Sequence, residues 1–128
     1  MREVAVIGVG MNRFGKYPEK GIKQLVEESV TKTLEDAGVK KSQIEAAFVG
    51  NAAAGLMTGQ EMIRGQTVLS ALGIDAIPIY NVENACASSS SAFNMAWMSV
   101  GSLGKLAGGQ ADMSWNFFMS SGSLPPSS

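Results

Sequence analysis

Residues 77–93 read Ile77-Pro78-Ile79-Tyr80-Asn81-Val82-Glu83-Asn84-Ala85-Cys86-Ala87-Ser88-Ser89-Ser90-Ser91-Ala92-Phe93, and they change character in the middle. The first six residues are mostly β-branched or aromatic, which predicts a strand, with Pro78 near its start where a sheet tolerates it. Residues 85–100 carry small and apolar side chains on every side, which predicts a helix that is buried rather than amphipathic. Cys86, the only cysteine of the chain, falls where the strand gives way to the helix.

Cys86 is the candidate nucleophile. A thiol at the amino end of a helix meets backbone N–H groups without an intrahelical acceptor, and it meets the positive end of the helix dipole. Both favour the thiolate, which is the reactive form of cysteine. A lone buried cysteine can also be a plain packing residue. Position alone therefore leaves both interpretations open.

Other nucleophile chemistries are not expected. The sequence contains no histidine, so no Cys/His pair can form within it. The four serines at residues 88–91 are not part of a Gly-x-Ser-x-Gly elbow, so a serine hydrolase is not predicted. A single cysteine forms no internal disulfide and, without histidine, no metal cluster.

Two more strands are expected upstream. Residues 4–10 form a β-branched run that ends in glycines, the pattern of a strand buried on both faces. Gly8 and Gly10 begin a G-x-G pattern, but Arg13 stands where a dinucleotide fingerprint needs its third glycine. Residues 46–50 predict a second buried strand.

Two helices are expected between these strands. Residues 22–37 repeat apolar side chains at helical spacing, and Gly38 occupies the C-cap position. Residues 60–72 predict a helix with Met62, Leu69 and Leu72 turned inward, after a small, flexible connection at residues 51–58. Strands that alternate with helices predict α/β layers around a largely parallel sheet.

Composition limits the partners. The chain has 128 residues, 45% of them hydrophobic and 16% charged, as in an ordinary globular domain. A net charge of -1 without a Lys/Arg stripe makes nucleic acid a poor partner. Residues 85–104 are too polar for a membrane span, and the opening residues lack a signal-peptide core, so we expect a cytoplasmic protein without a membrane span.

The segment around Cys86 resembles a known family. Asn81-Val82-Glu83-Asn84-Ala85-Cys86-Ala87-Ser88-Ser89 is similar to the nucleophile segment of the thiolase superfamily, closest to thiolases and sterol-carrier-protein-type thiolases. Residues 4–15 resemble that family's first strand and the loop after it, and residues 44–51 resemble its second strand. The resemblance covers residues 1–101 in register.

The resemblance implies a thiolase-like layered α/β fold. This chain would be an incomplete N-terminal half, with a mostly parallel mixed sheet and a buried nucleophile helix. Residues 106–114 look like the family's next strand and glycine turn, arriving a few residues early. We therefore expect a partial thiolase-like domain at residues 1–114 and an unrecognised, disordered tail at residues 115–128.

The resemblance also implies a chemistry. In the family, the cysteine attacks an acyl-CoA thioester, and the acyl-enzyme then takes part in carbon–carbon bond formation or thiolytic cleavage. Only Cys86 matches a catalytic position here, because the family's activating histidine and second acid/base residue lie in its C-terminal half. The substrate would be a coenzyme A thioester, with no permanently bound cofactor and no metal. The chain alone would be inactive.

The expected partners follow from the same resemblance. The two halves of the family pack helix on helix, so a first half alone would expose Phe93, Trp97 and Met98. We expect a homo-oligomer or a complementary C-terminal chain. Three alternatives stay open: a ketosynthase-like or hydroxymethylglutaryl-synthase-like condensing enzyme, a non-catalytic binding module with Cys86 merely buried, and a truncated or altered gene product.

Overall fold

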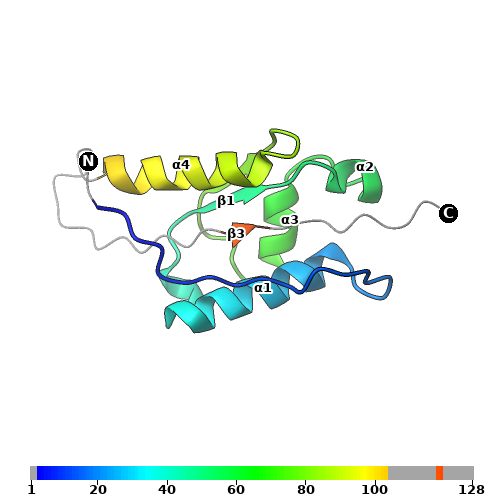
Figure 1. Ribbon diagram of the computed structural model, residues 1–128, viewed down its shortest axis with the longest axis horizontal. Coiled ribbons are helices and arrows are strands. Elements are labelled where there is room, and N and C mark those ends of the chain that lie inside the picture. Colours follow the sequence, from blue (N-terminus) through cyan, green and yellow to red (C-terminus); the bar gives the residue numbers. More distant parts are fainter. Residues whose placement is uncertain (1–2, 104–117, 120–128) are drawn as a thin grey trace.

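The structure is a computed structural model, and it describes residues 3–103 and 118–119. A three-stranded parallel sheet lies between two helical layers, with α4 on one face and α1 and α3 on the other (Figure 1). The expected α/β layering around a parallel sheet is confirmed. In chain order the elements are α1 (Ile22–Ala37), η1 (Lys41–Gln43), β1 (Ala47–Gly50), α2 (Ala54–Thr58), α3 (Arg64–Ser70), β2 (Ile79–Val82), α4 (Ser88–Leu103) and β3 (Phe118–Met119).

The central strand is β1, and β2 and β3 pair with it on either side. Both pairs are parallel, and the register places Phe48 opposite Tyr80. These two rings stack with their centroids 4.8 Å apart. The strands predicted at residues 46–50 and 77–82 are therefore both present, each shortened at its start and ending where predicted.

The hydrophobic core has two parts because successive residues of β1 point to opposite faces of the sheet. Phe48 packs with Ala92 and Ala96 of α4. Ala47 and Val49 pack on the other side, against the buried face of α1 and α3. Every residue of β1 is buried, as its continuous apolar run predicted. The helical and loop residues of this second core are Val26, Val30, Leu34, Ile44, Val68, Leu69, Leu72 and Ile74.

Helix α1 has the bounds that its apolar spacing predicted. Val26 anchors it and is only 1% exposed. Gly38 ends it with φ 67°, a left-handed conformation that a residue without a Cβ adopts at low cost. Before its start, the Lys20 ammonium binds the Glu28 carboxylate at 2.5 Å, and this hydrogen bond raises the pKa of Lys20 above its ordinary value.

The connection at residues 51–58 is more ordered than predicted, because its second part forms α2. The Asn51 side chain starts this short helix by accepting a hydrogen bond from the Ala54 N–H at 2.9 Å. Asn51 thus links the end of β1 to the first turn of α2. The prediction of a flexible connection was wrong for this part.

Helix α3 is shorter than the helix predicted at residues 60–72. Leu69 and Leu72 are buried, as expected. Met62 was expected to point inward, and that prediction was wrong because its side chain is 78% exposed. The helix begins only at Arg64, so Met62 lies in the preceding loop and takes no part in the helical periodicity.

The N-terminal segment departs most from expectation. No strand forms at residues 4–10. The segment instead runs along α1 (Figure 1), and the Val9 N–H donates a hydrogen bond to Asp36 Oδ2 at 2.8 Å. A Cβ at Gly10 would collide with the backbone of Ser29 and Thr33, which shows how closely the segment approaches the helix. The neighbouring side chains are largely exposed, because the segment lies against α1 and pairs with none of the three strands.

Helix α4 is buried on one side only. Its small residues Ser88, Ala92 and Ala96 face the sheet and are buried. The larger apolar residues Phe93, Trp97 and Met98 are 41%, 40% and 44% exposed. The prediction of a helix buried all round is therefore corrected for this structure, whereas the exposure expected for these three side chains is observed.

The tail expected at residues 115–128 is described only at Phe118–Met119. These two residues form β3, which pairs in parallel with Val49 and Gly50 of β1. The prediction of disorder was thus wrong for these two positions. The remainder of that segment and the strand expected at residues 106–114 lie outside the described residues, and the domain boundary at residue 114 stays a prediction.

Candidate active site

Cys86 lies in the short connection between the carboxyl end of β2 and the amino end of α4. The sequence predicted this junction correctly. The thiol is free and exposed, so the alternative of a cysteine merely buried in a core does not describe this structure. The first N–H groups of a helix have no intrahelical acceptor. Cys86, two residues before α4 begins, lies beside such groups.

The backbone before Cys86 is held in an unusual conformation. Ala85 has φ 46°, in the left-handed region. This conformation costs an L-residue with a Cβ about 1–2 kcal/mol. The Ala85 N–H donates to Glu83 Oε1 at 2.7 Å, so a nearby carboxylate stabilises the turn. Strained backbone of this kind is often found at functional sites.

Ser88, the first residue of α4, binds the same connection from the other side. Its hydroxyl accepts a hydrogen bond from the Asn84 N–H at 2.8 Å and donates one to the Ala85 carbonyl at 2.7 Å. The Ser88 N–H also donates to that carbonyl, at 3.2 Å. Because Ser88 is only 3% exposed, these hydrogen bonds are well shielded from water.

A further hydrogen bond extends this arrangement along α4. The Asn84 side-chain amide donates to the Ser91 hydroxyl at 2.9 Å. Two of the four serines at residues 88–91 therefore bind the loop that carries Cys86. From the sequence, these serines were considered only as hydrolase nucleophiles, and this role was missed. The signal that could have identified it is a Ser/Thr/Asn-rich junction at the start of a helix, where such side chains satisfy backbone groups.

Gly50 allows the amino end of α4 to approach the sheet. A Cβ at this position would lie 2.7 Å from the Ser88 carbonyl oxygen and 2.8 Å from Ser89 Cα. Only glycine leaves room for the two backbones at this distance. The end of β1 thus fixes the position of the helix start, and with it the position of the Cys86 loop.

The end of β2 is anchored to α3. The Asn81 carbonyl oxygen Oδ1 accepts from the Gly65 N–H at 2.6 Å, and its Nδ2 donates to Gln66 Oε1 at 2.7 Å. Gln66 Nε2 in turn donates to the Ile79 carbonyl at 3.1 Å. These side chains hold the strand that leads into the Cys86 loop.

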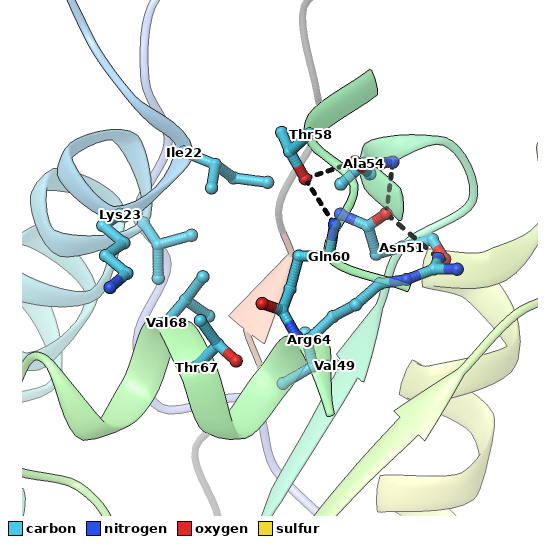
Figure 2. A pocket seen from close by; sticks show the side chains of 11 residues that line it. Ile22, Lys23, Val49, Asn51, Ala54, Thr58, Gln60, Arg64, Thr67 and Val68 are labelled. Atoms are coloured by element: carbon cyan, nitrogen blue, oxygen red, sulfur yellow. Dashed lines mark hydrogen bonds between the residues drawn. The ribbon is translucent and has the colours of Figure 1, made fainter. Parts of the chain in front are cut away.

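A pocket of about 220 Å³ lies on the opposite face of β1 from α4. Val26, Val49 and Val68 form apolar walls, and Figure 2 shows Gln60 and Thr58 beside them. Ala54 and Thr58 of α2 also line this pocket. Its polar side chains bind mostly within the protein: the Thr58 hydroxyl donates to the Ala54 carbonyl, and Arg64 Nη1 donates to the Asn51 carbonyl at 2.9 Å.

A family model describes most of the chain. The model for the thiolase N-terminal domain matches residues 4–122. The chain therefore belongs to the thiolase family, as the residues around Cys86 indicated. The match continues past residue 114, where inspection of the sequence found no further resemblance.

The characterised relatives agree with this assignment. The acetyl-CoA acetyltransferases of Methanocaldococcus jannaschii and Methanothermobacter thermautotrophicus are 40% and 38% identical to the chain, each over 102 residues. Human sterol carrier protein 2 is 36% identical over 99 residues. The aligned region is 80% of this chain and 26% of each acetyltransferase, so the chain spans about a quarter of the length of these relatives.

Solved structures share the fold at low sequence identity. The 3-oxoacyl-[acyl-carrier-protein] synthase III of Aquifex aeolicus matches with a TM-score of 0.58 at 14% identity, over 74% of this chain and 30% of its own. The priming β-ketosynthase of the R1128 polyketide pathway matches with a TM-score of 0.51 at 21% identity, over 72% of this chain and 27% of its own. They place the chain in the thiolase-like fold.

Among the described residues, no helix has the length and apolar character needed to cross a membrane.

Proposed function

We propose that this chain is the nucleophile-bearing part of a thiolase-type acyltransferase and that Cys86 accepts an acyl group from an acyl-CoA. The observation that carries the proposal is the exposed Cys86 between β2 and the amino end of α4, inside the region that matches the thiolase family model. The similarity to acetyl-CoA acetyltransferases supports a coenzyme A thioester as the substrate.

The proposed step is acyl transfer to sulfur. The Cys86 thiolate attacks the thioester carbonyl carbon, so a new sulfur–carbon bond forms and the negative charge moves to the carbonyl oxygen. Collapse of this intermediate breaks the bond between the acyl carbon and the sulfur of coenzyme A. The Cys86 thiol first loses its proton to solvent. The coenzyme A thiolate takes up a proton from solvent as it leaves, so the protons balance. The N–H groups of Ala87 and Ser88 already bind the Asn84 and Ala85 carbonyls, so the Cys86 N–H is the backbone donor that we propose for the oxyanion.

We further propose that the chain does not complete a catalytic cycle by itself. It covers about a quarter of the length of the acetyltransferases that it resembles, and its sequence contains no histidine to serve as the acid/base. The exposed side of α4 supports association with another copy or with a complementary chain. Carbon–carbon bond formation or cleavage would then require the residues of that partner.

The acyl-cysteine is tested by incubating the purified chain with acetyl-CoA and measuring the intact mass. The expected result is a mass increase of one acetyl group, located at Cys86 by peptide mapping, with release of no more than one equivalent of coenzyme A. The Cys86→Ser variant should give no thioester that hydroxylamine can cleave. An unmodified wild-type protein, or an equal adduct in Cys86→Ala, would rule out the acyl-accepting role, and continued release of coenzyme A would rule out the inactivity.

A further inference from the structure

We propose that Glu83 and Ser88 are positioning residues that hold Ala85 in its left-handed conformation and thereby set the place of the Cys86 thiol. Together they are called the loop clamp. This inference rests on the proposed role of Cys86 as the acyl acceptor, and it concerns side chains that do not touch the acyl group themselves.

The first observation is that the loop clamp binds both sides of one residue. The Glu83 carboxylate accepts the Ala85 N–H, and the Ser88 hydroxyl and N–H donate to the Ala85 carbonyl. The N–H and the carbonyl of Ala85 are thus bound by Glu83, before it in the loop, and by Ser88, the first residue of α4. A left-handed alanine is unfavourable by itself, so the hydrogen bonds around it are what keep the turn in this shape.

The second observation is the burial of Ser88. A hydroxyl that is removed from water must find hydrogen-bond partners inside the protein. The Ser88 hydroxyl is both acceptor and donor to the Cys86 loop. It accepts a hydrogen bond from the Asn84 N–H and donates one to the Ala85 carbonyl. A serine that served only as a small packing residue could be replaced by alanine without consequence for the loop. Here the replacement leaves the Asn84 N–H without this acceptor.

The third observation is the close contact between Ser88 and the sheet, which fixes the position of the loop clamp. Ser88 begins α4, and its backbone lies so close to Gly50 that no side chain fits between them. The helix start therefore cannot move toward the sheet. Because Ser88 is held by β1, its hydroxyl transmits the position of the sheet to the Cys86 loop two residues earlier.

The experiment compares Ser88→Ala, Ser88→Thr and Ser90→Ala. Cys86 is the only cysteine, so its iodoacetamide alkylation can be followed by intact mass without ambiguity. Loss of one hydrogen bond is expected to slow alkylation about fivefold in Ser88→Ala and to speed amide exchange at Asn84. Ser88→Thr keeps the hydroxyl and should restore both values. Ser90→Ala changes an exposed serine of the same helical turn and should match the wild type.

The second arm uses Glu83, whose side chain is exposed, so its replacement opens no cavity in the core. Glu83→Gln keeps an oxygen acceptor for the Ala85 N–H and should leave Ala85 exchange near the wild-type value, whereas Glu83→Ala should raise it. Wild-type alkylation rates in both Ser88→Ala and Glu83→Ala would overturn the inference. Equal slowing in Ser88→Ala and Ser88→Thr would also overturn it, because the hydroxyl would then be irrelevant.

These measurements require no acyl-CoA. A wild-type chain that forms no acetyl adduct but shows the expected alkylation and exchange pattern would refute the proposed function and leave the loop clamp standing. Formation of the adduct with equal yield and rate in all Ser88 and Glu83 variants would support the proposed function and refute the loop clamp.

Discussion

Gly50 and Ala85 carry the two demanding backbone positions around Cys86. Gly50 permits a contact between β1 and the amino end of α4 that any side chain would prevent. Ala85 adopts a left-handed conformation although it has a Cβ. The close contact at position 50 is possible because glycine has no side chain. The left-handed conformation of Ala85 is stabilised by hydrogen bonds to its neighbours. Even a small change of side chain at Gly50 or Ala85 should therefore shift the Cys86 loop.

Gly50→Ala is expected to destabilise the chain by about 2 kcal/mol, because its methyl group would overlap the Ser88 carbonyl and force α4 away from the sheet. Urea unfolding measures this change. Gly15→Ala is the control, since a Cβ there meets only the Tyr17 ring at 3.5 Å, an ordinary contact. Equal stability of Gly50→Ala and the wild type would show that α4 is not held at this contact.

At the scale of elements, long-range contacts decide which apolar runs are covered. β1 is paired on both sides and packed on both faces, so its short run is wholly buried. Residues 4–10 have a similar composition but lie along α1 without strand pairing. The side chain of Val6 is consequently 63% exposed. Burial in this molecule thus depends on the place of a segment in the sheet as well as on its apolar content.

Val6→Asp and Val26→Asp test this difference directly. Val6→Asp should change the free energy of unfolding by no more than about 0.5 kcal/mol, as is usual for an exposed position. Val26→Asp places an unpaired carboxylate in the core between α1 and α3, so it should leave the chain unfolded. Circular dichroism and urea unfolding distinguish the two results. Severe destabilisation by Val6→Asp would mean that residues 4–10 are buried as a strand.

For the whole molecule, the outer side of α4 is notable because it exposes several large apolar side chains of one helix. Phe93, Trp97 and Met98 lie on one helix at spacings of four and one, and each keeps about two fifths of its surface in contact with water. Apolar surface gathered in one place favours association. The sheet side of α4 is thus covered by β1, and nothing among the described residues covers its other side.

We expect the purified chain to self-associate through this side of α4. Sedimentation velocity over a range of concentrations should show a rising average mass for the wild type and a lower one for Trp97→Gln. Leu56→Gln on α2 removes an apolar side chain that is even more exposed, at 87% against 40% for Trp97, and should behave as the wild type. If both variants lower the average mass equally, association does not depend on the α4 side.

Several elements and the place of Cys86 between a strand and a helix could be derived from the sequence because they depend on local patterns. Helical spacing predicted α1, Gly38 predicted its end, and the change of composition after Val82 placed Cys86 between a strand and a helix. Periodicity and turn chemistry act over a few residues, so one stretch of chain contains the information. The loop clamp was predicted only in part. The run of serines was evident from the sequence, but the hydrogen bonds of Ser88 to Asn84 and Ala85 were not.

The tertiary structure alone decided which segments pair and which faces stay exposed. β2 and β3 pair with β1, whereas residues 4–10 pair with none of the three strands and lie on α1 despite their strand-like composition. Met62 is exposed because α3 begins two residues later, and α4 keeps an open side because nothing among the described residues covers it. Such outcomes depend on competition between distant parts of the chain for the same edge or surface, and no local pattern records that competition.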